Sequence, residues 1–237
     1  MSPLSPSSEF QLSSVAFFGR TFDEYFQFFG LDGPSLNCRS VLDVAAGPSS
    51  FTAEASARGL HAVAVDPLYG FSTDTLTAHV QIDYARMVAE MRRKEGQFRY
   101  KYVPSLAAAE ASRRSAAEQF LADYESGFVR SRYIGAKLPR LPFADGAFDL
   151  VLCAHLLFLY SRQFDYGFHF AACRELVRVS AGEVRLHPLC GLDGQPYPEL
   201  GRLQSALGRE GIASRVVAVD YEFFAGSGTT LILTRNS

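Results

Sequence analysis

Apolar runs of strand length alternate with segments of helical spacing along most of the chain, most clearly over residues 40–70. An apolar run there ends in Asp43, a small-residue turn and a helix-like segment follow, and a second apolar run ends in Asp66. This order predicts a strand, a tight loop, a helix and a second strand. In open parallel sheets ligands bind outside the carboxyl ends of the strands, where an acid can accept hydrogen bonds from a ribose diol. The stretch therefore predicts half of a nucleoside-binding site.

Later apolar runs predict the rest of a sheet. The continuous run FDLVLC over residues 148–153 is typical of a central parallel strand. The pattern predicts further helices and strands over residues 166–179, 182–187, 197–210, 215–219 and 229–234. The last two strands are joined by a short link that contains FFAGSG. Because parallel neighbours need a longer crossover, this link predicts an antiparallel hairpin.

A short aromatic helix is predicted over residues 21–30, before the first strand. Its aromatic side chains recur at helical spacing, at Phe22, Tyr25, Phe26 and Phe29. Thr21 is a suitable N-cap, Glu24 is the partner that a capping box requires, and Gly30 ends the helix. Such a helix either packs on the sheet or covers the site.

Side chains of this segment fall into two groups. Packing in the core is the expected role of Phe22, Phe26 and Phe29. Arg20 and Tyr25 carry polar groups, and each is a candidate contact to a ligand. For both residues the alternative is a structural role alone.

About sixty residues follow the second strand before another strand is predicted, far more than a strand–helix connection takes. The apolar positions of this insertion, about 71–131, favour two helices. The first has one apolar face formed by Val80, Tyr84, Met87, Val88 and Met91. The second is expected over residues 106–128. An insertion at this point lies over the carboxyl edge of the sheet, so we expect a helical lid.

Composition narrows the class of protein and its partners. The 237 residues are 48% hydrophobic and 20% charged, which suits a single domain over residues 15–237 after a flexible tail of residues 1–14. A net charge of −2 offers no basic field for nucleic acid. Four cysteines match no zinc spacing and are expected to be buried free thiols. No signal peptide or membrane span is evident, so we expect a cytoplasmic protein with a small-molecule substrate and an unknown oligomeric state.

Five segments, in order, resemble one known family. They are VLDVAAGPSS after the first strand, VAVDP, LPFADGAFDLVLCAH, RELVRVS and the closing hairpin. Together they resemble the class I methyltransferases that use S-adenosylmethionine, over about residues 40–235. GRTFDEYFQFFGLD and HLLFLYSRQFDYGFH resemble a poorly characterised bacterial subset of that family. The resemblance implies a Rossmann-like α/β sandwich with a mostly parallel seven-stranded sheet and an antiparallel C-terminal hairpin.

The same resemblance implies the residues of a cofactor site. In the family the first loop is glycine-rich, whereas here Ala45 and Ser49 stand in place of two glycines and Gly47 is retained. Asp66 is expected to bind the ribose hydroxyls, and Leu68 with backbone groups to hold the adenine. The residues expected to bind S-adenosylmethionine are Arg20, Tyr25, Asp43, Ala45, Gly47, Pro48, Asp66, Pro67, Leu68 and Cys153. No metal site is expected.

Catalysis is expected near the end of the fourth strand. The loop after that strand commonly faces the reactive methyl group in this fold, which makes His155 and Tyr160 the candidate catalytic residues. A neutral histidine can take a proton near pH 7, but His155 lies in an apolar stretch where a core histidine is an equal alternative. His187, at the end of the fifth predicted strand, is a second candidate.

Three functions remain open from the sequence. The first is methyl transfer to a small-molecule acceptor. The second is cyclisation of S-adenosylmethionine to azetidine-2-carboxylate with release of methylthioadenosine. That reaction needs a dry aromatic pocket, for which the candidates are Tyr25, Phe158, Tyr160, Tyr221 and Phe223. The third is binding of S-adenosylmethionine without catalysis. A nicotinamide-dependent enzyme is disfavoured because the loop lacks Gly-x-Gly-x-x-Gly.

Overall fold

The computed structural model describes residues 15–36 and 39–236, so the tail predicted over residues 1–14 and Cys38 lie outside the described residues. A seven-stranded sheet has the order β3-β2-β1-β4-β5-β7-β6. Its strands are β1 (Ser40–Val44), β2 (His61–Asp66), β3 (Tyr133–Gly135), β4 (Phe148–Ala154), β5 (Ser180–His187), β6 (Ile212–Ala218) and β7 (Thr229–Arg235). The pairs β5–β7 and β6–β7 are antiparallel and the others are parallel. The predicted mostly parallel sheet with an antiparallel C-terminal hairpin is therefore confirmed.

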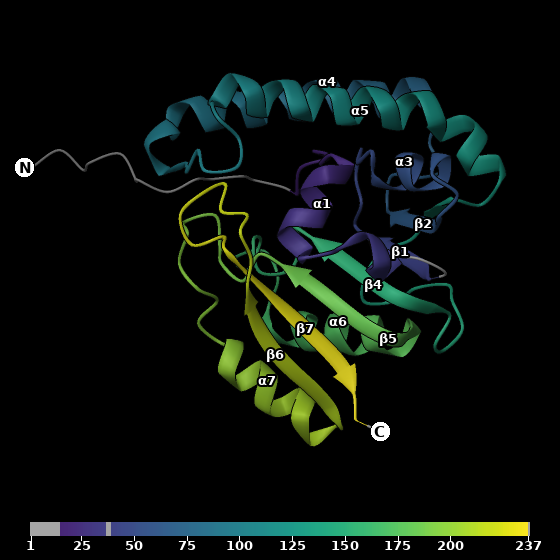
Figure 1. Cartoon of the computed structure of the whole chain (residues 1–237), viewed down its shortest axis with the longest axis vertical. Helices are drawn as coiled ribbons and strands as arrows, with labels where there is room; N and C mark the ends of the chain where they lie inside the picture. The colour runs from purple at the N-terminus through teal and green to yellow at the C-terminus, as the bar shows by residue number, and fades with distance from the viewer. Residues whose placement is uncertain (1–14, 37–38, 237) are drawn as a thin grey trace, which may run out of the picture.

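Helices cover both faces of the sheet (Figure 1). One face is covered by α1 and α3, and the other by α6 and α7. The helices are α1 (Phe22–Phe29), α2 (Gly33–Leu36), α3 (Phe51–Ala57), α4 (Thr73–Arg93), α5 (Leu106–Val129), α6 (Tyr166–Val179) and α7 (Leu200–Arg209), with a 3₁₀ turn η1 (Glu95–Gln97). Because the central strands are covered on both sides, they contain continuous apolar runs.

The apolar run of strand β4 contributes side chains to the cores on both faces of the sheet. Leu150 and Leu152 point into the cluster beneath α1, whereas Val151 and Cys153 point into the cluster beneath α6. Successive side chains of a strand face opposite sides, so one unbroken apolar run supplies both cores. The strand ends at Ala154, which brings the next residue, His155, to the carboxyl edge of the sheet.

The helix α1 has the predicted ends. Thr21 and Glu24 form the capping box, and Gly30 ends the helix with φ 60°. Phe26 packs against the core as predicted but is only half-buried, whereas Phe28, which the sequence analysis did not single out, is fully buried. The helix turns Tyr25, Phe28 and Phe29 toward the sheet, which leaves Phe26 at the edge of the contact.

Two long helices, α4 and α5, form the insertion between β2 and β3. They lie side by side on the α1 and α3 side of the sheet, across the top of Figure 1. Ser72 caps α4, and Ser105 caps α5. Within the described residues, no helix combines the length and apolar composition that a membrane span requires.

Element ends differ from the sequence prediction mainly in the C-terminal third. The helix α7 begins at Leu200 rather than at Tyr197, and β6 begins at Ile212 rather than at Arg215. As an edge strand, β6 has little burial along its length, so its apolar pattern marks its ends poorly. The three described cysteines, Cys153, Cys173 and Cys190, are free and buried as predicted.

Candidate active site

A cavity of about 740 Å³ lies at the carboxyl ends of β1, β2 and β4. Its size suits one ligand of nucleoside-cofactor dimensions. The segment before α1, the helix α4 and the loop after β3 complete its walls. Eight of the residues predicted from the sequence line it: Arg20, Tyr25, Ala45, Gly47, Asp66, Pro67, Leu68 and His155. The structure thus brings most of the predicted site together in one place.

Asp66 is held rigidly at the tip of β2. One carboxylate oxygen accepts a hydrogen bond from the backbone N–H of Leu68 at 3.0 Å, and the other accepts one from the N–H of Gly47 at 3.1 Å. Burial raises the pKa of Asp66 to about 6, although these two hydrogen bonds oppose the rise. The result is a fixed carboxylate at the cavity wall, with lone pairs available to hydroxyl donors.

The loop after β1 keeps a glycine-like backbone despite its substitutions. Ala45 has φ 58° and Gly47 has φ 56°. A left-handed backbone at alanine costs about 1–2 kcal/mol, so the fold holds this loop against a local preference. A Cβ at Gly47 would meet only ordinary contacts, so the glycine is needed for its φ rather than for space. The loop is further fixed by Tyr69, whose hydroxyl donates to the Gly47 carbonyl at 2.6 Å.

Asp43 lies beneath the cavity rather than in its wall. Its side chain is fully buried, and one oxygen accepts a hydrogen bond from the Tyr25 hydroxyl at 2.8 Å. Its other oxygen has no hydrogen-bond partner among the described residues. Burial raises the pKa of Asp43 to about 7, a bond from Tyr25 opposes this, and the charge of Asp66 adds to it. Asp43 therefore positions Tyr25, which does line the cavity.

His155 follows β4 directly and has a left-handed backbone, with φ 53°. Its N–H donates to the carbonyl of His187 at 2.6 Å, and its Nδ1 has no partner among the residues that the structure describes. Burial and the nearby charge of Arg20 hold the pKa of His155 well below 6.5, so the ring is neutral at pH 7. A neutral imidazole in the wall of a cavity is suited to accept a hydrogen bond from a ligand.

His187 stacks on Phe28, with ring centroids 4.9 Å apart. Thr230 donates its hydroxyl proton to the Phe28 carbonyl at 2.6 Å, so its oxygen accepts a hydrogen bond from Nδ1 of His187 at 3.0 Å. This assigns the proton of the neutral ring to Nδ1. Burial and Arg20 lower the pKa of His187 to about 3. His187 does not line the cavity, and its role is to support His155 through its carbonyl.

Arg20 lines the cavity, and its guanidinium is held in place by backbone carbonyls. Nη1 donates to the carbonyls of Phe18 and Gly19 at 3.1 and 3.0 Å, while Nε has no partner in the described part of the chain. Burial and the charge of Arg113 lower the pKa of Arg20 to about 10, so the group stays charged at neutral pH. A charged guanidinium at a cavity wall is suited to bind a carboxylate.

Three predicted site residues lie behind the cavity wall. The Tyr160 hydroxyl accepts a hydrogen bond from the Ala16 N–H at 3.0 Å, which ties down the segment before α1. Cys153 is buried in the core beneath α6, and burial raises the pKa of its thiol. Pro48 packs its carbonyl against Gly19, where a Cβ would come within 1.9 Å of the carbonyl oxygen. These residues shape the site without contacting the cavity.

The structure also adds wall residues that sequence reasoning missed. His79 and Asp83, one helical turn apart on α4, line the cavity. Asp83 accepts a hydrogen bond from the Phe17 N–H at 2.6 Å, and so fixes the segment before α1. The only signal in the sequence was a polar pair at i, i+4 on a helix, which is common on solvated faces.

The five aromatic side chains considered for a cyclisation pocket do not gather around this cavity. Only Tyr25 among them lines it. Phe158 packs on the far side of the sheet against His169 and Tyr197. The Tyr221 hydroxyl is bound to Glu24 at 2.7 Å.

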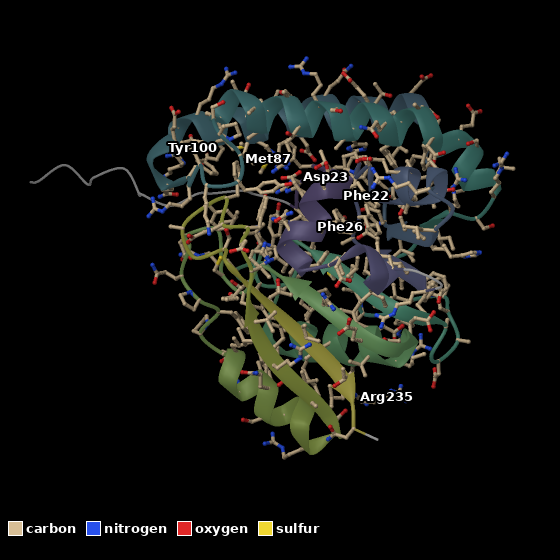
Figure 2. The ribbon with its side chains drawn as sticks, viewed as in Figure 1. Phe22, Asp23, Phe26, Met87, Tyr100 and Arg235 are labelled. Carbon is tan, nitrogen blue, oxygen red and sulfur yellow. The ribbon has the colours of Figure 1, made fainter. Side chains whose placement is uncertain are left out.

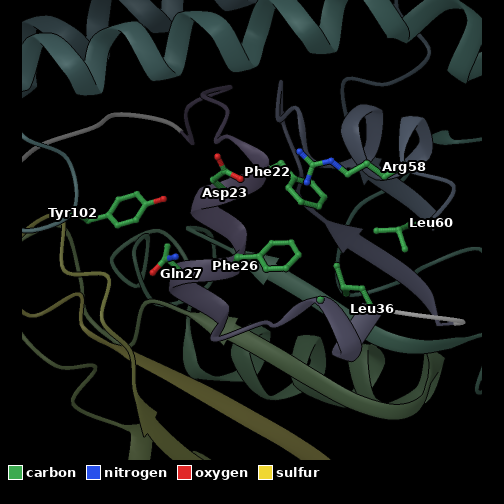
Figure 3. Close-up of a pocket in the computed structure, with 9 residues that line it drawn as sticks. Phe22, Asp23, Phe26, Gln27, Leu36, Arg58, Leu60 and Tyr102 are labelled. Carbon is green, nitrogen blue, oxygen red and sulfur yellow. The ribbon is translucent and has the colours of Figure 1, made fainter.

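A second concavity of about 550 Å³ lies on the outer side of α1 (Figure 3). Its labelled side chains are Phe22, Asp23, Phe26, Gln27, Leu36, Arg58, Leu60 and Tyr102. It shares no lining residue with the cavity described above. The Arg58 guanidinium lies 3.8 Å from the centroid of the Phe22 ring. This concavity contains none of the strand-tip carboxylates or the histidine, so we place the candidate active site in the larger cavity.

In the described part of the chain, no group of three or more His, Cys, Asp or Glu side chains is arranged to hold a metal ion.

Comparisons with known proteins give distant similarities. No family model matches the chain. An uncharacterised protein of Methanocaldococcus jannaschii is 29% identical over 225 residues, which cover 94% of this chain and 98% of that protein. Among solved structures, magnesium protoporphyrin IX methyltransferase from Synechocystis is similar over 91% of this chain and 78% of its own, with 14% identity and a TM-score of 0.47. A putative S-adenosylmethionine-dependent methyltransferase from Methanococcus maripaludis is similar over 91% and 84%, with 13% identity and a TM-score of 0.46.

The arrangement of the sheet is the firmer basis for classification. Five parallel strands in the order β3-β2-β1-β4-β5 are followed by an antiparallel pair in which β7 lies inside β6. The strand order reverses between β1 and β4, at the point where the cavity opens. In the order and direction of its seven strands, this chain has a Rossmann-like α/β fold with an antiparallel C-terminal hairpin.

Proposed function

We propose that this protein is an S-adenosylmethionine-dependent transferase that moves a methyl group to a small-molecule acceptor. The observation that carries the proposal is the Asp66 carboxylate, fixed by two backbone N–H groups at the wall of a cavity at the sheet's switch point. A carboxylate in this position is suited to accept both hydroxyls of a ribose.

The remaining wall groups match the other parts of the same cofactor. Leu68 and the loop after β3 offer an apolar slot next to Asp66 for a purine base. The loop containing Gly47 brings backbone close to the chain that joins ribose to the methionine end. The charged guanidinium of Arg20, a residue of the cavity wall, suits the methionine carboxylate. An anion there would balance a buried cation that has no acidic hydrogen-bond partner of its own among the described residues.

Methyl transfer at this site requires few catalytic groups from the protein. S-adenosylmethionine supplies an activated methyl group, so placing the acceptor in line contributes most of the catalysis. His155 is the residue we assign to the proton of the acceptor, because it lines the cavity and its ring is neutral. Because the pKa of His155 lies well below 6.5, the ring is unprotonated throughout the neutral range, and the same shift makes it a weaker base than an exposed histidine.

Incubation with S-adenosylmethionine and a small-molecule extract, followed by mass spectrometry, tests the proposal. We expect S-adenosylhomocysteine to form only when the extract is present, and not with the Asp66→Asn variant. Methylthioadenosine with an azetidine acid, formed without extract, would instead establish cyclisation. Binding without either product would establish a non-catalytic binding protein.

A further inference from the structure

A small apolar chamber adjoins the candidate active site. Its volume is about 50 Å³, and its walls come from α4, from the turn after η1 and from the loop between β6 and β7. The wall residues that matter here are Met87, Met91, Phe98, Leu159, Leu192 and Phe223. We call this space the methionine chamber. Figure 2 shows Met87 on the side of α4 that faces the rest of the chain.

The chamber meets the larger cavity at three shared residues, Phe18, Arg20 and His155. Apart from His155, Arg20 and Gln97, every residue that lines the chamber has an apolar side chain. His155 also borders the larger cavity, and its Nδ1 has no partner in the described ranges. A molecule that placed its apolar end in the chamber would therefore bring its polar end to His155.

Size limits what the chamber can hold. A water molecule occupies about 30 Å³ of liquid, and an apolar cavity known to bind benzene has a volume of about 150 Å³. A volume of about 50 Å³ thus has room for a chain of two or three carbons but excludes a ring. Polar occupants are disfavoured because the walls offer almost no hydrogen-bonding groups.

The chamber is built separately from the proposed cofactor site. Asp66 ends β2, and Gly47 and Leu68 belong to the loops after β1 and β2. None of the three lines the chamber. Two of its walls come from the insertion and the C-terminal hairpin instead. Met87 and Met91 are unbranched and adapt readily to an occupant. The two spaces can therefore be filled by different molecules at once, with His155 between them.

We propose that the methionine chamber holds the short aliphatic end of the methyl acceptor, a molecule that presents a hydroxyl or thiol to His155. This rests on the proposed function. In the transfer, the oxygen or sulfur of the acceptor forms a bond to the methyl carbon. The carbon–sulfur bond of the sulfonium breaks, and its electron pair stays on the departing sulfur. The acceptor's proton passes to the imidazole of His155, which borders both spaces.

Two methionine side chains in the chamber can report on its occupancy by NMR. It contains three methionines, of which Met87 and Met91 line the chamber and Met1 lies outside the described residues. Methionine methyl groups labelled with ¹³C can be followed by NMR while 1-propanethiol is added to the protein saturated with S-adenosylhomocysteine. We expect saturable shifts of both Met87 and Met91 signals. Leu192→Phe, which fills the chamber, should weaken the response at least tenfold, and Leu60→Phe, in the concavity of Figure 3, should not.

A second measurement uses turnover. With S-adenosylmethionine as donor, methylation of 1-propanethiol should exceed that of benzyl mercaptan at least tenfold, because a ring does not fit. Absent shifts, shifts that persist unchanged in Leu192→Phe, or faster methylation of the ring compound would each overturn the assignment.

Calorimetry with S-adenosylhomocysteine separates this proposal from the one on which it rests. If that ligand binds and the methionine signals do not respond to the thiol, only the chamber assignment fails. If the ligand does not bind but the thiol still shifts both signals without it, the proposed function fails and the chamber stands as an apolar binding site.

Discussion

Replacement of Arg113 on α5 offers a quantitative test of how the insertion is attached to the sheet. Arg113 and Glu24 form an ion pair in which both side chains are almost fully buried. Nη2 of Arg113 also donates to the Tyr221 hydroxyl at 3.3 Å, and that hydroxyl donates to Glu24 at 2.7 Å. The Thr21 N–H donates to the same carboxylate at 3.0 Å. One buried network thus joins α1, α5 and the C-terminal hairpin.

The loss of stability expected when Arg113 is replaced can be derived in two ways. Burial alone would raise the pKa of Glu24, but the charges of Arg113 and Arg20 outweigh it and lower the pKa from 4.5 to about 2. That difference corresponds to about 3 kcal/mol of stability at neutral pH. Removing one partner of a buried pair costs about 3–5 kcal/mol by comparison with other proteins. We therefore expect Arg113→Met to lower the free energy of unfolding by about 3 kcal/mol and the melting temperature by about 6–12 °C.

The pH dependence provides a sharper check. Because the folded-state pKa of Glu24 lies below 4.5, its contribution is complete above about pH 4.5 and is lost as pH falls toward 2. The difference in urea-unfolding free energy between wild type and Arg113→Met should therefore fall to about half by pH 3.

Two companion variants complete this test. Arg114→Met, at the exposed next position on α5, should change stability by less than about 1 kcal/mol. Glu24→Gln combined with Arg113→Met should be more stable than Arg113→Met alone, because no buried carboxylate is left unpaired. A loss below about 1 kcal/mol for Arg113→Met, or a loss independent of pH, would refute the reasoning.

Three further predictions follow from the site. Ribose hydroxyls that donate to Asp66 should lower its pKa from about 6, so binding of S-adenosylhomocysteine should release protons near pH 5–6. The calorimetric enthalpy of binding should then depend on the ionisation enthalpy of the buffer, and no such dependence would contradict the prediction. His155→Gln should reduce kcat about 100-fold or more with little change in S-adenosylhomocysteine affinity, and wild-type kcat should show no histidine inflection near pH 6.5. Gly19→Ala should lower the free energy of unfolding in urea by about 1–3 kcal/mol, because its Cβ would clash with the Pro48 carbonyl. Gly33→Ala is the control: its Cβ meets no neighbour within 4 Å, so it should not lower that free energy.

Local features of the site could be predicted from the sequence. Asp66 is the last residue of an apolar run, and Gly47 lies in a turn that follows another, so both were identified from short stretches. The capping box of Thr21 and Glu24 spans four residues and was identified in the same way. Parallel strand ends meet at one edge of a sheet, which is why these separate short patterns fall in one cavity.

Long-range pairings could not be predicted. Glu24 is separated from Arg113 by 89 positions and from Tyr221 by 197, and no periodicity links them. The sequence therefore showed the capping role of Glu24 but not its buried ion pair. Phe26 and Phe28 illustrate a related limit, since helical spacing identifies an apolar face but not its rotation against the sheet. The walls of the methionine chamber combine residues 87–98, 159, 192 and 223, which only the fold brings together.

Calorimetric titration of the wild-type protein with S-adenosylhomocysteine, compared with Asp66→Asn, tests the central claim most directly. Asp145→Asn is the matched control, because Asp145 is mostly exposed and pairs with Arg178 far from the cavity. Two hydrogen bonds to a charged group contribute about 1.5–3 kcal/mol each. We therefore expect Asp66→Asn to weaken binding at least about 100-fold and Asp145→Asn to leave it unchanged. Equal affinity of all three proteins, or no binding by the wild type, would contradict the account.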